Sequence, residues 1–268
     1  MKRIVFLFTI VQFLIACNEI RWGGGGNDID LWRDTEIWEF AKLISNGTYE
    51  KAEVMLEDNK IDIDFREPKY GETLLSWAVQ NDNLEAVKFL VDHGANPNAH
   101  DTYFGRSPMV FAAEEFNSIE ILRYLLGHGG NPNDCANDRE ILKEGPWPHT
   151  PLIGAAFISM EKTKMLVEAG GDPNFAVEPG FTSFTQASMR NKLDVLEYLL
   201  RNCRIDYGKS YIVTQRKDTL FLKENIKNDE VVYQMDSVRV KRILKYLDII
   251  QRETCSPRDC PVSKDSVR

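Results

Sequence analysis

Few side chains in this sequence have the types and spacings that catalysis or metal binding requires. The 268 residues include four histidines, and His93 and His128 each stand just before a glycine that ends an apolar periodic segment. A cation there stabilises a helix C-terminus, so we interpret both as framework residues. His100 and His149 have no second histidine at the four-residue spacing of a helical metal site. We therefore expect no metal site, no cofactor and no catalytic histidine.

The five cysteines lead to the same expectation. Cys135 and Cys203 lie far apart in the sequence, and four residues separate Cys255 from Cys260, whereas metal-binding and redox motifs usually have two. Outside the cytoplasm a Cys255–Cys260 disulfide is one interpretation and two free thiols are the other. No set of nucleophile, base and orienting residue is visible, which favours a protein that is not an enzyme. The alternative is an enzyme with catalytic groups in residues 134–149 and the C-terminal tail.

Composition excludes several classes of protein. With 43% hydrophobic and 28% charged residues, the chain is neither disordered nor a membrane protein with several spans. Its net charge of −8 argues against nucleic-acid binding, which needs a basic surface. The acidic excess lies in residues 17–208, while residues 209–268 are net basic. An acidic body would attract a protein partner with a basic surface. The alternative is that the acidic residues only keep an extended surface soluble.

The N-terminus has the pattern of a signal peptide. Lys2 and Arg3 precede the apolar stretch 4–15, which is shorter than the 18 or so residues of a membrane span. The sequence Leu-Ile-Ala-Cys that ends at Cys17 resembles the lipobox of bacterial lipoproteins. This resemblance implies cleavage after residue 16, lipidation of Cys17 and a lipid anchor in the bacterial cell envelope, on the periplasmic side of a membrane or at the cell surface. An ordinary secreted protein is the alternative.

A glycine-rich segment follows Cys17. Gly23–Gly26 form a run of four glycines, and glycine loses the most conformational freedom on ordering. We therefore predict that residues 17–33 are a flexible linker between the anchor and the folded body.

The body of the chain repeats itself. Four stretches align when a threonine or serine is placed in register, and each is followed by a second apolar segment. Three of the copies then end in a glycine-containing turn with Asn-Pro-Asn or Asp-Pro-Asn. The four aligned residues are Thr73, Ser107, Thr150 and Thr182.

These stretches resemble the ankyrin-repeat family, whose motif is Thr-Pro-Leu-His-x-Ala with a period near 33 residues. The aligned residues are 34, 43 and 32 residues apart, so a surplus of about ten residues falls in the loop between Asn133 and Thr150. The histidine of the motif is absent and is replaced by Ser76, Val110, Ile153 and Thr185.

The resemblance implies an all-α ankyrin-repeat solenoid: stacked helix-turn-helix units with β-hairpin loops and degenerate capping repeats at both ends. We assign the repeats to residues 34–208, including a degenerate first repeat, and C-terminal capping helices to residues 209–252. Within these, residues 236–251 are predicted to form an amphipathic helix. Its basic face is interpreted as a solvated cap, and a membrane or nucleic-acid site is the alternative. Residues 253–268 are predicted to be a disordered tail. Leu90, Leu125 and Leu199 occupy equivalent second-helix positions and should be buried.

The resemblance also places protein partners on the concave face, which hairpin tips and first helices line. Lys69 and Glu72 fall at tip positions, and five aromatic residues occur at such tips. The alternative is that Phe104 and Phe181 fold back on their own hairpins and that Phe157 and Ile158 pack on the long loop. The predicted protein-binding residues are Tyr70, Tyr103, Phe104, Arg106, Glu114, Glu115, Trp147, Phe157, Ile158, Phe181, Met189 and Arg190.

The sequence thus predicts a membrane-tethered, monomeric lipoprotein that acts as a non-enzymatic scaffold for protein–protein interaction. The alternative is an immunity protein, similar in layout to those that bind and block an antibacterial toxin in the cell envelope.

Overall fold

The computed structural model describes residues 28–58, 61–114, 119–135, 150–176, 182–190, 192–205, 211–213, 219–221 and 245. The chain divides into two compact units, Met1–Pro148 (unit 1) and His149–Arg268 (unit 2). The predicted signal peptide, Cys17, the Cys255–Cys260 pair and the tail lie outside the described residues. So does the predicted helix 236–251, except for Lys245.

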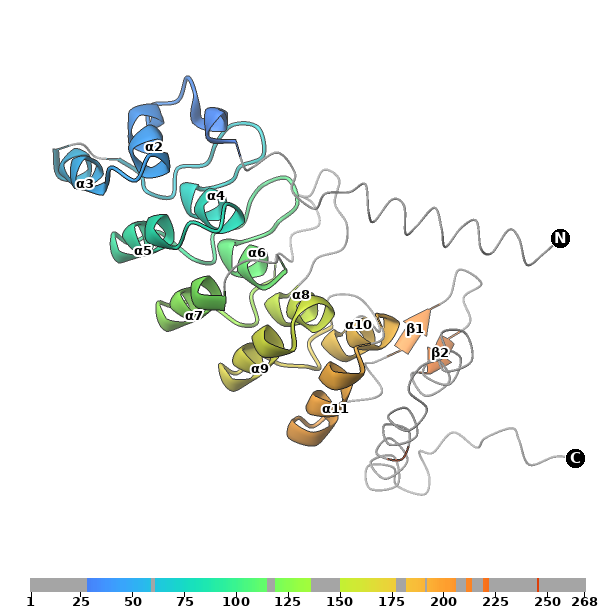
Figure 1. The fold of residues 1–268 in the computed structure, drawn as a ribbon. Coiled ribbons are helices and arrows are strands. Elements are labelled where there is room, and N and C mark those ends of the chain that lie inside the picture. Colours follow the sequence, from blue (N-terminus) through green and yellow to red (C-terminus); the bar gives the residue numbers. More distant parts are fainter. Residues whose placement is uncertain are drawn as a thin grey trace, which may run out of the picture. The chain divides into compact units, whose positions relative to one another are not determined.

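Unit 1 is built from pairs of helices. After the 3-10 helix η1(Ile29–Trp32) come α2(Trp38–Ser45), α3(Tyr49–Asp58), α4(Leu74–Gln80), α5(Leu84–Asp92), α6(Pro108–Glu114) and α7(Ile119–Gly127). Each even-numbered helix packs against the next odd-numbered helix, and the pairs also pack on one another, with α4 beside α6 and α5 beside α7 (Figure 1). This is the predicted stack of helix-turn-helix units.

The aligned threonines and serine begin the first helix of each pair. The Thr73 hydroxyl accepts a hydrogen bond from the Ser76 N–H at 3.2 Å, and Ser107 does the same for the Val110 N–H at 3.3 Å. Thr150 and Thr182 cap α8 and α10 in unit 2 in this way. These bonds satisfy N–H groups that the helix leaves without partners. The predicted caps are confirmed.

The two histidines that precede the repeat glycines lie where the sequence placed them. His93 is the C-cap of α5, and its Nδ1 lies 2.7 Å from the Phe89 carbonyl oxygen. His128 follows α7, and its Nδ1 lies 2.8 Å from the Tyr124 carbonyl oxygen. Both side chains belong to the helix-ending framework.

The core of unit 1 lies between the helix pairs. Leu90 of α5 and Leu125 of α7 are fully buried, as predicted from their equivalent positions. Other fully buried apolar residues of unit 1 include Leu74, Leu75, Val87, Met109, Phe111 and Leu122.

The first repeat extends further toward the N-terminus than the predicted boundary. Trp32 of η1 is fully buried and η1 packs on α2, whereas the sequence placed residues up to 33 in the flexible linker. Burying an indole ring stabilises a fold by about 2–3 kcal/mol, enough to order a short segment. Val54 of α3 is 55% exposed, the largest exposure of a bulky apolar side chain among the described residues.

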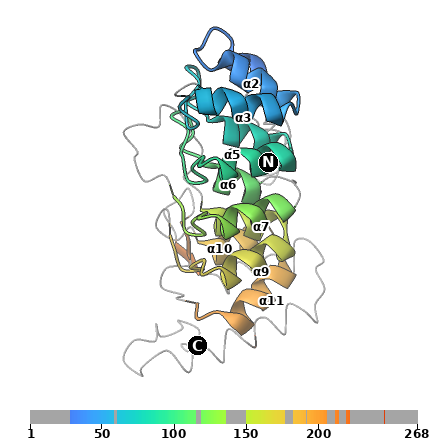
Figure 2. The same cartoon turned by 90° about the vertical axis from the view of Figure 1, so that its left-hand side faces the viewer.

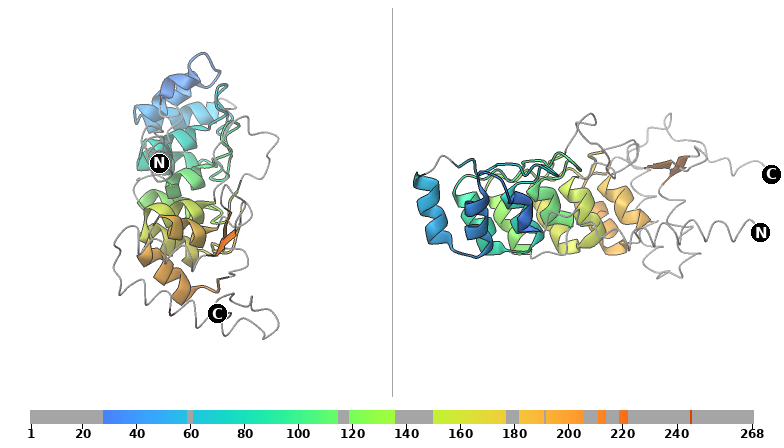
Figure 3. Two further views of the ribbon diagram at one scale, coloured as in Figure 1. Left: turned by 90° about the vertical axis from the view of Figure 1, so that its right-hand side faces the viewer. Right: turned by 90° about the horizontal axis from the view of Figure 1, so that it is seen from above.

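Two hairpin loops, here called fingers, extend from unit 1: residues 61–73 (the first finger) and 95–107 (the second finger). The Glu67 N–H donates to the Glu72 carbonyl oxygen at 3.0 Å, and the Asp101 N–H donates to that of Arg106 at 2.9 Å. These turns are hairpins, as predicted, but no regular strand occurs in either finger. The fingers lie side by side on one side of the helices (Figure 2; Figure 3, right).

Asparagine and aspartate side chains join successive repeats where each finger begins. The Asn96 N–H donates to Asp64 Oδ1 at 2.9 Å, and the Asn131 N–H donates to Asn98 Oδ1 at 2.8 Å. Asn98 Nδ2 also donates to the Gly129 carbonyl oxygen at 2.9 Å. Each repeat is therefore bonded to the next through side-chain amides or carboxylates as well as through its apolar core.

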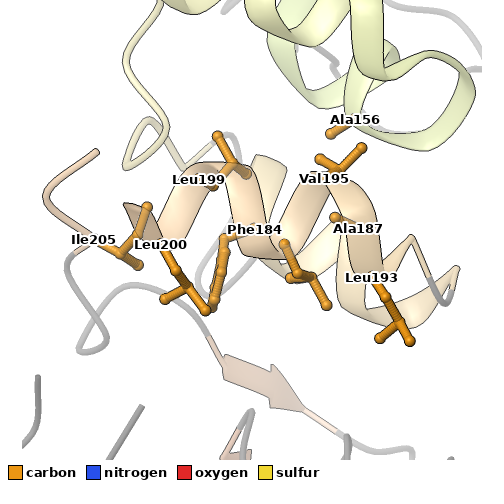
Figure 4. Packing of buried hydrophobic residues seen from close by; sticks show 9 residues of the cluster. Ala156, Phe184, Ala187, Leu193, Val195, Leu199, Leu200 and Ile205 are labelled. Carbon is orange, nitrogen blue, oxygen red and sulfur yellow. The ribbon is translucent and has the colours of Figure 1, made fainter. Parts of the chain in front are cut away.

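Unit 2 contains two further helix pairs: α8(Pro151–Ile158) with α9(Met160–Glu168), and α10(Ser183–Met189) with α11(Leu193–Asn202). Helix α10 packs against α8 and α11 contacts α9, which repeats the arrangement within unit 1. Phe184, Leu196 and Leu199 lie in a buried cluster between α10 and α11 (Figure 4). The predicted burial of Leu199 is confirmed.

Two short strands differ from the predicted helical cap of residues 209–252. The strands β1(Tyr211–Val213) and β2(Thr219–Phe221) pair antiparallel, with Ile212 opposite Leu220. Aromatic and β-branched residues of the kind found in both segments favour strands over helices.

Candidate functional site

A buried carboxylate organises the first finger. Glu67 Oε2 accepts a hydrogen bond from the Lys69 N–H at 2.6 Å, and its Oε1 accepts from the N–H groups of Tyr70 at 2.5 Å and Glu72 at 3.2 Å. A carboxylate forms stronger bonds to backbone N–H groups than a neutral acceptor does. Glu67 therefore fixes the turn that carries Lys69 and Tyr70.

Asp101 has the same role in the second finger. Its Oδ1 accepts from the N–H groups of Tyr103, Phe104 and Gly105 at 2.9, 2.5 and 3.0 Å, and its Oδ2 accepts from that of Arg106 at 3.0 Å. The sequence reasoning missed both acids. Their signal was available, because Glu67 and Asp101 each precede the capping threonine or serine by six residues.

A third buried acid, Asp134, lies in the loop that follows α7 and bonds to the second finger. Its buried carboxylate accepts a hydrogen bond from the Ser107 hydroxyl group and lies 3.0 Å from His100 Nε2. His100 therefore belongs to a contact between successive repeats.

The rigid turns bring three aromatic residues together at the fingers. Tyr70 and Tyr103 meet edge to face, with ring centroids 5.4 Å apart at 87°, and Tyr103 meets Phe104 at 4.5 Å and 80°. We call Tyr70, Tyr103 and Phe104 the aromatic finger cluster. All three are half-buried, so part of each ring remains accessible. The structure thus brings together three of the predicted binding residues.

Cations lie over two of these rings. Lys69 Nζ is 4.8 Å from the centre of the Tyr70 ring, and the Arg106 guanidinium is 4.8 Å from that of Phe104. Phe104 contacts Tyr103 and Arg106 of its own finger, in agreement with the alternative that this ring folds back. It nevertheless remains part of a cluster formed by both fingers.

Arg106 and Glu114 are more enclosed than the sequence suggested. The Arg106 guanidinium also lies 4.3 Å from the Phe111 ring, and its Nη1 is 4.0 Å from Glu114 Oε2. Both side chains are 11% exposed. Because the Arg106 guanidinium lies over two phenylalanine rings and both charged side chains are largely enclosed, this ion pair mainly supports the second finger on α6 and presents little surface to a partner.

Glu72, which the sequence placed at a tip, is buried beneath the fingers. Its side chain is 1% exposed, and its Oε2 accepts a hydrogen bond from Gln80 Nε2 at 2.9 Å. Burial raises the pKa of the Glu72 carboxyl from 4.5 to about 7, although the hydrogen bond from Gln80 and the charge of Arg106 act in the opposite direction. Glu72 can therefore change its charge near neutral pH.

In unit 2, the predicted residues form a smaller group. The Arg190 guanidinium lies 4.4 Å from the centre of the Phe157 ring, and Phe157 and Ile158 at the end of α8 are half-buried. Met189 is the last residue of α10. Glu115, Trp147 and Phe181 lie outside the described residues.

The described part of the chain offers no other chemical centre. It contains no group of three histidine, cysteine or acidic residues that could hold a metal ion. Burial, together with the charge of Asp134, raises the pKa of the Cys135 thiol to about 11, so it is not a nucleophile at neutral pH. No helix within the described ranges is both long enough and apolar enough to cross a membrane.

Comparison with known proteins agrees with this architecture. Residues 40–136 match the family model for ankyrin repeats, in three copies. Over 158 residues, 59% of the chain, the sequence is 27% identical to human transient receptor potential cation channel subfamily A member 1, and the chain covers 13% of that protein's length. The crystal structure of an ankyrin repeat domain from Acinetobacter baumannii AYE superimposes with a TM-score of 0.61 at 21% identity, covering 80% of this chain and 98% of that one.

Ankyrin repeats are in general modules for protein–protein interaction, and they use extended concave surfaces for it. The motif at Thr73, Ser107, Thr150 and Thr182, the paired helices, the family-model match and the similar solved structure all agree with this fold. The chain has the ankyrin-repeat fold, and residues 40–136 are its match to the ankyrin-repeat family model.

Proposed function

We propose that this chain is a non-enzymatic scaffold that binds a protein partner through the fingers and first helices of unit 1, while a lipid on Cys17 tethers it to a membrane of the bacterial cell envelope. The observation that carries the proposed binding site is the aromatic finger cluster, in which rings from two repeats meet on turns fixed by buried carboxylates.

The cluster has the properties of an interface anchor. Aromatic side chains contribute much of the binding energy of protein interfaces. The backbone turns that carry them are already ordered by Glu67 and Asp101, so a partner would not have to supply the cost of ordering these loops. The half-buried rings of Tyr70 and Tyr103 leave area for contact.

Photo-crosslinking of the full chain tests the proposed surface. A photoreactive amino acid is placed at Tyr103, and at Lys88 as a control on α5, whose side chain pairs with Glu85 at 2.9 Å. In membranes of cells that naturally make the protein, we expect one discrete crosslinked protein from position 103 and none from position 88. The same product from both positions, or none from position 103, would contradict the proposal.

Identification of the crosslinked protein separates the two versions of the function. A secreted antibacterial toxin would identify the chain as an immunity protein, and any other envelope protein would support a general scaffold.

The tether is tested separately. The sequence Leu-Ile-Ala-Cys at residues 14–17 supports it, and several acyl chains together bind a membrane stably where one does so only weakly. Cys17→Ser should release the protein from the membrane fraction. A Cys17→Ser protein that still sediments with membranes after a high-salt wash would contradict lipidation.

A further inference from the structure

The acidic side chains of the two finger turns point inward. Glu67 and Asp101 are buried, and their oxygens accept seven backbone hydrogen bonds between them. Glu72, the remaining acid of residues 66–72 and 101–106, is buried against Gln80. None of the three carboxylates is placed to meet a partner directly.

The cations of the same turns are arranged differently. Arg66 and Lys69 are exposed residues at the first finger. Arg66 Nη1 donates to the Gly71 carbonyl oxygen at 3.2 Å, which holds the guanidinium across the turn. Lys69 Nζ lies over the Tyr70 ring, and the side-chain hydrogen bond to Tyr70 raises the pKa of Lys69.

Two acids at the start of the first finger are engaged by backbone N–H groups. Asp64 Oδ1 accepts from Asn96 at 2.9 Å, and Asp62 Oδ1 accepts from Asp64 at 3.0 Å. Asp62 and Asp64 keep their negative charges, but within the turn segments 66–72 and 101–106 the exposed charged side chains are the cations Arg66 and Lys69, although the whole chain has a net charge of −8.

We infer that the first two fingers bind an acidic, extended peptide segment of the partner, with carboxylates against Arg66 and Lys69 and an apolar or aromatic side chain against Tyr70 and Tyr103. This inference rests on the proposed function and names the chemistry of the partner at that site. The net charge of the chain suggested a partner with a basic surface, whereas the side chains at the fingers favour an acidic partner segment there. Long-range attraction depends on the whole charge distribution, whereas specificity depends on the charges in contact.

The test is selection of random twelve-residue peptides, displayed on phage, against the purified full chain. We expect enriched peptides to carry aspartate or glutamate within a few residues of an aromatic or large aliphatic side chain. A synthetic version of the most enriched peptide, and a matched version with each acid replaced by its amide, are then compared by fluorescence anisotropy. The acidic peptide should bind about tenfold more tightly at low salt, with a smaller difference at high salt.

Charge variants connect this binding to the fingers. Lys69→Glu should weaken the acidic peptide by about tenfold, and Lys69→Met should weaken it less because the side-chain stem still covers Tyr70. Lys88→Glu on α5 is the matched control and should leave affinity unchanged. Equal melting temperatures for the three variants would show that the fold is retained.

The inference is overturned if no peptide is enriched, if lysine and arginine are enriched instead, or if Lys88→Glu weakens binding as much as Lys69→Glu does. Its failure is distinguishable from failure of the proposed function. A discrete crosslink from position 103 together with basic peptides would keep the binding surface and reject only the acidic partner segment.

Discussion

Thr102 of the second finger is bonded twice to Tyr70 of the first. Its backbone N–H and its hydroxyl group both donate to the Tyr70 carbonyl oxygen, at 2.9 and 3.1 Å. Gly71, the next residue, has a φ of +73°, and a Cβ atom there would lie 2.2 Å from the Thr102 hydroxyl oxygen. The close approach of the two fingers therefore depends on a glycine at position 71.

A left-handed conformation costs a residue with a side chain about 1–2 kcal/mol. Gly71→Ala should destabilise unit 1 by more than this, because Thr102 must also move to make room for the added Cβ atom. Gly94→Ala is the matched control: its φ is +94°, and no atom lies within 4 Å of the added Cβ. Urea unfolding of both variants measures the difference. Equal losses of unfolding free energy in the two variants would show that the two fingers can move apart at Gly71 without loss of stability.

Glu72 should make stability depend on pH in an unusual direction. Because the pKa of Glu72 is about 7 in the folded chain and near 4.5 when exposed, the folded state binds more protons than the unfolded state between these values. The contribution of the Glu72 carboxyl to the free energy of unfolding is therefore fully present below pH 4.5 and is lost as the pH rises through 7. Glu72→Gln should remove this loss and stabilise the protein at pH 8 by on the order of 1–3 kcal/mol.

The measurement is the difference in unfolding free energy between wild type and Glu72→Gln from pH 4.5 to 8, since other titrating groups cancel in it. Glu57→Gln, at an exposed position of α3, is the control and should show a flat difference. A flat difference for Glu72→Gln as well would mean that its carboxyl is solvated.

Asp101→Asn tests the carboxylate that organises the second finger. An amide keeps the shape but removes the charge and one acceptor oxygen from a group with four backbone partners. We expect a loss of about 2 kcal/mol, together with faster hydrogen exchange at the amides of Tyr103 and Phe104. Glu85→Gln, on the exposed side of α5, is the control and should change neither. Unchanged exchange in Asp101→Asn would show that the turn orders without its carboxylate.

Leu125→Ala tests the core of unit 1. The side chain of Leu125 is fully buried in α7, so its truncation should cost about 2–5 kcal/mol by thermal or urea unfolding. Val54→Ala in α3 removes methyl groups from an exposed side chain and should stay within about 0.5 kcal/mol of wild type. Similar values for the two variants would contradict the packing.

The sequence predicted the features that repeat. The caps at Thr73 and Ser107 and the burial of Leu90, Leu125 and Leu199 follow from local patterns, and the structure confirms them. Glu67 and Asp101 repeat as well, but the sequence reasoning did not single them out, because their partners are backbone N–H groups, which a sequence does not display.

Other features depend on contacts that local patterns do not carry. The ion pair of Arg106 with Glu114 requires a finger to fold back on the end of its own α6. The surroundings of Glu72 combine Gln80 of α4 with Asp101 and Arg106 of the second finger, which lie close enough to act on its charge. Trp32 was assigned to the linker because only the packing of η1 on α2 shows how it is buried.

The bonds that join successive repeats at the start of each finger also bear on how such a chain can change during evolution. Asp64 and Asn98 each reach the repeat that follows and no other described repeat. A duplication of one whole repeat would therefore carry both the donor of one such bond and the acceptor of the next. The array could lengthen or shorten by a full repeat and still pair every one of these hydrogen-bonding groups. A change of half a unit would break the register, so growth of this protein is expected to proceed in whole repeats.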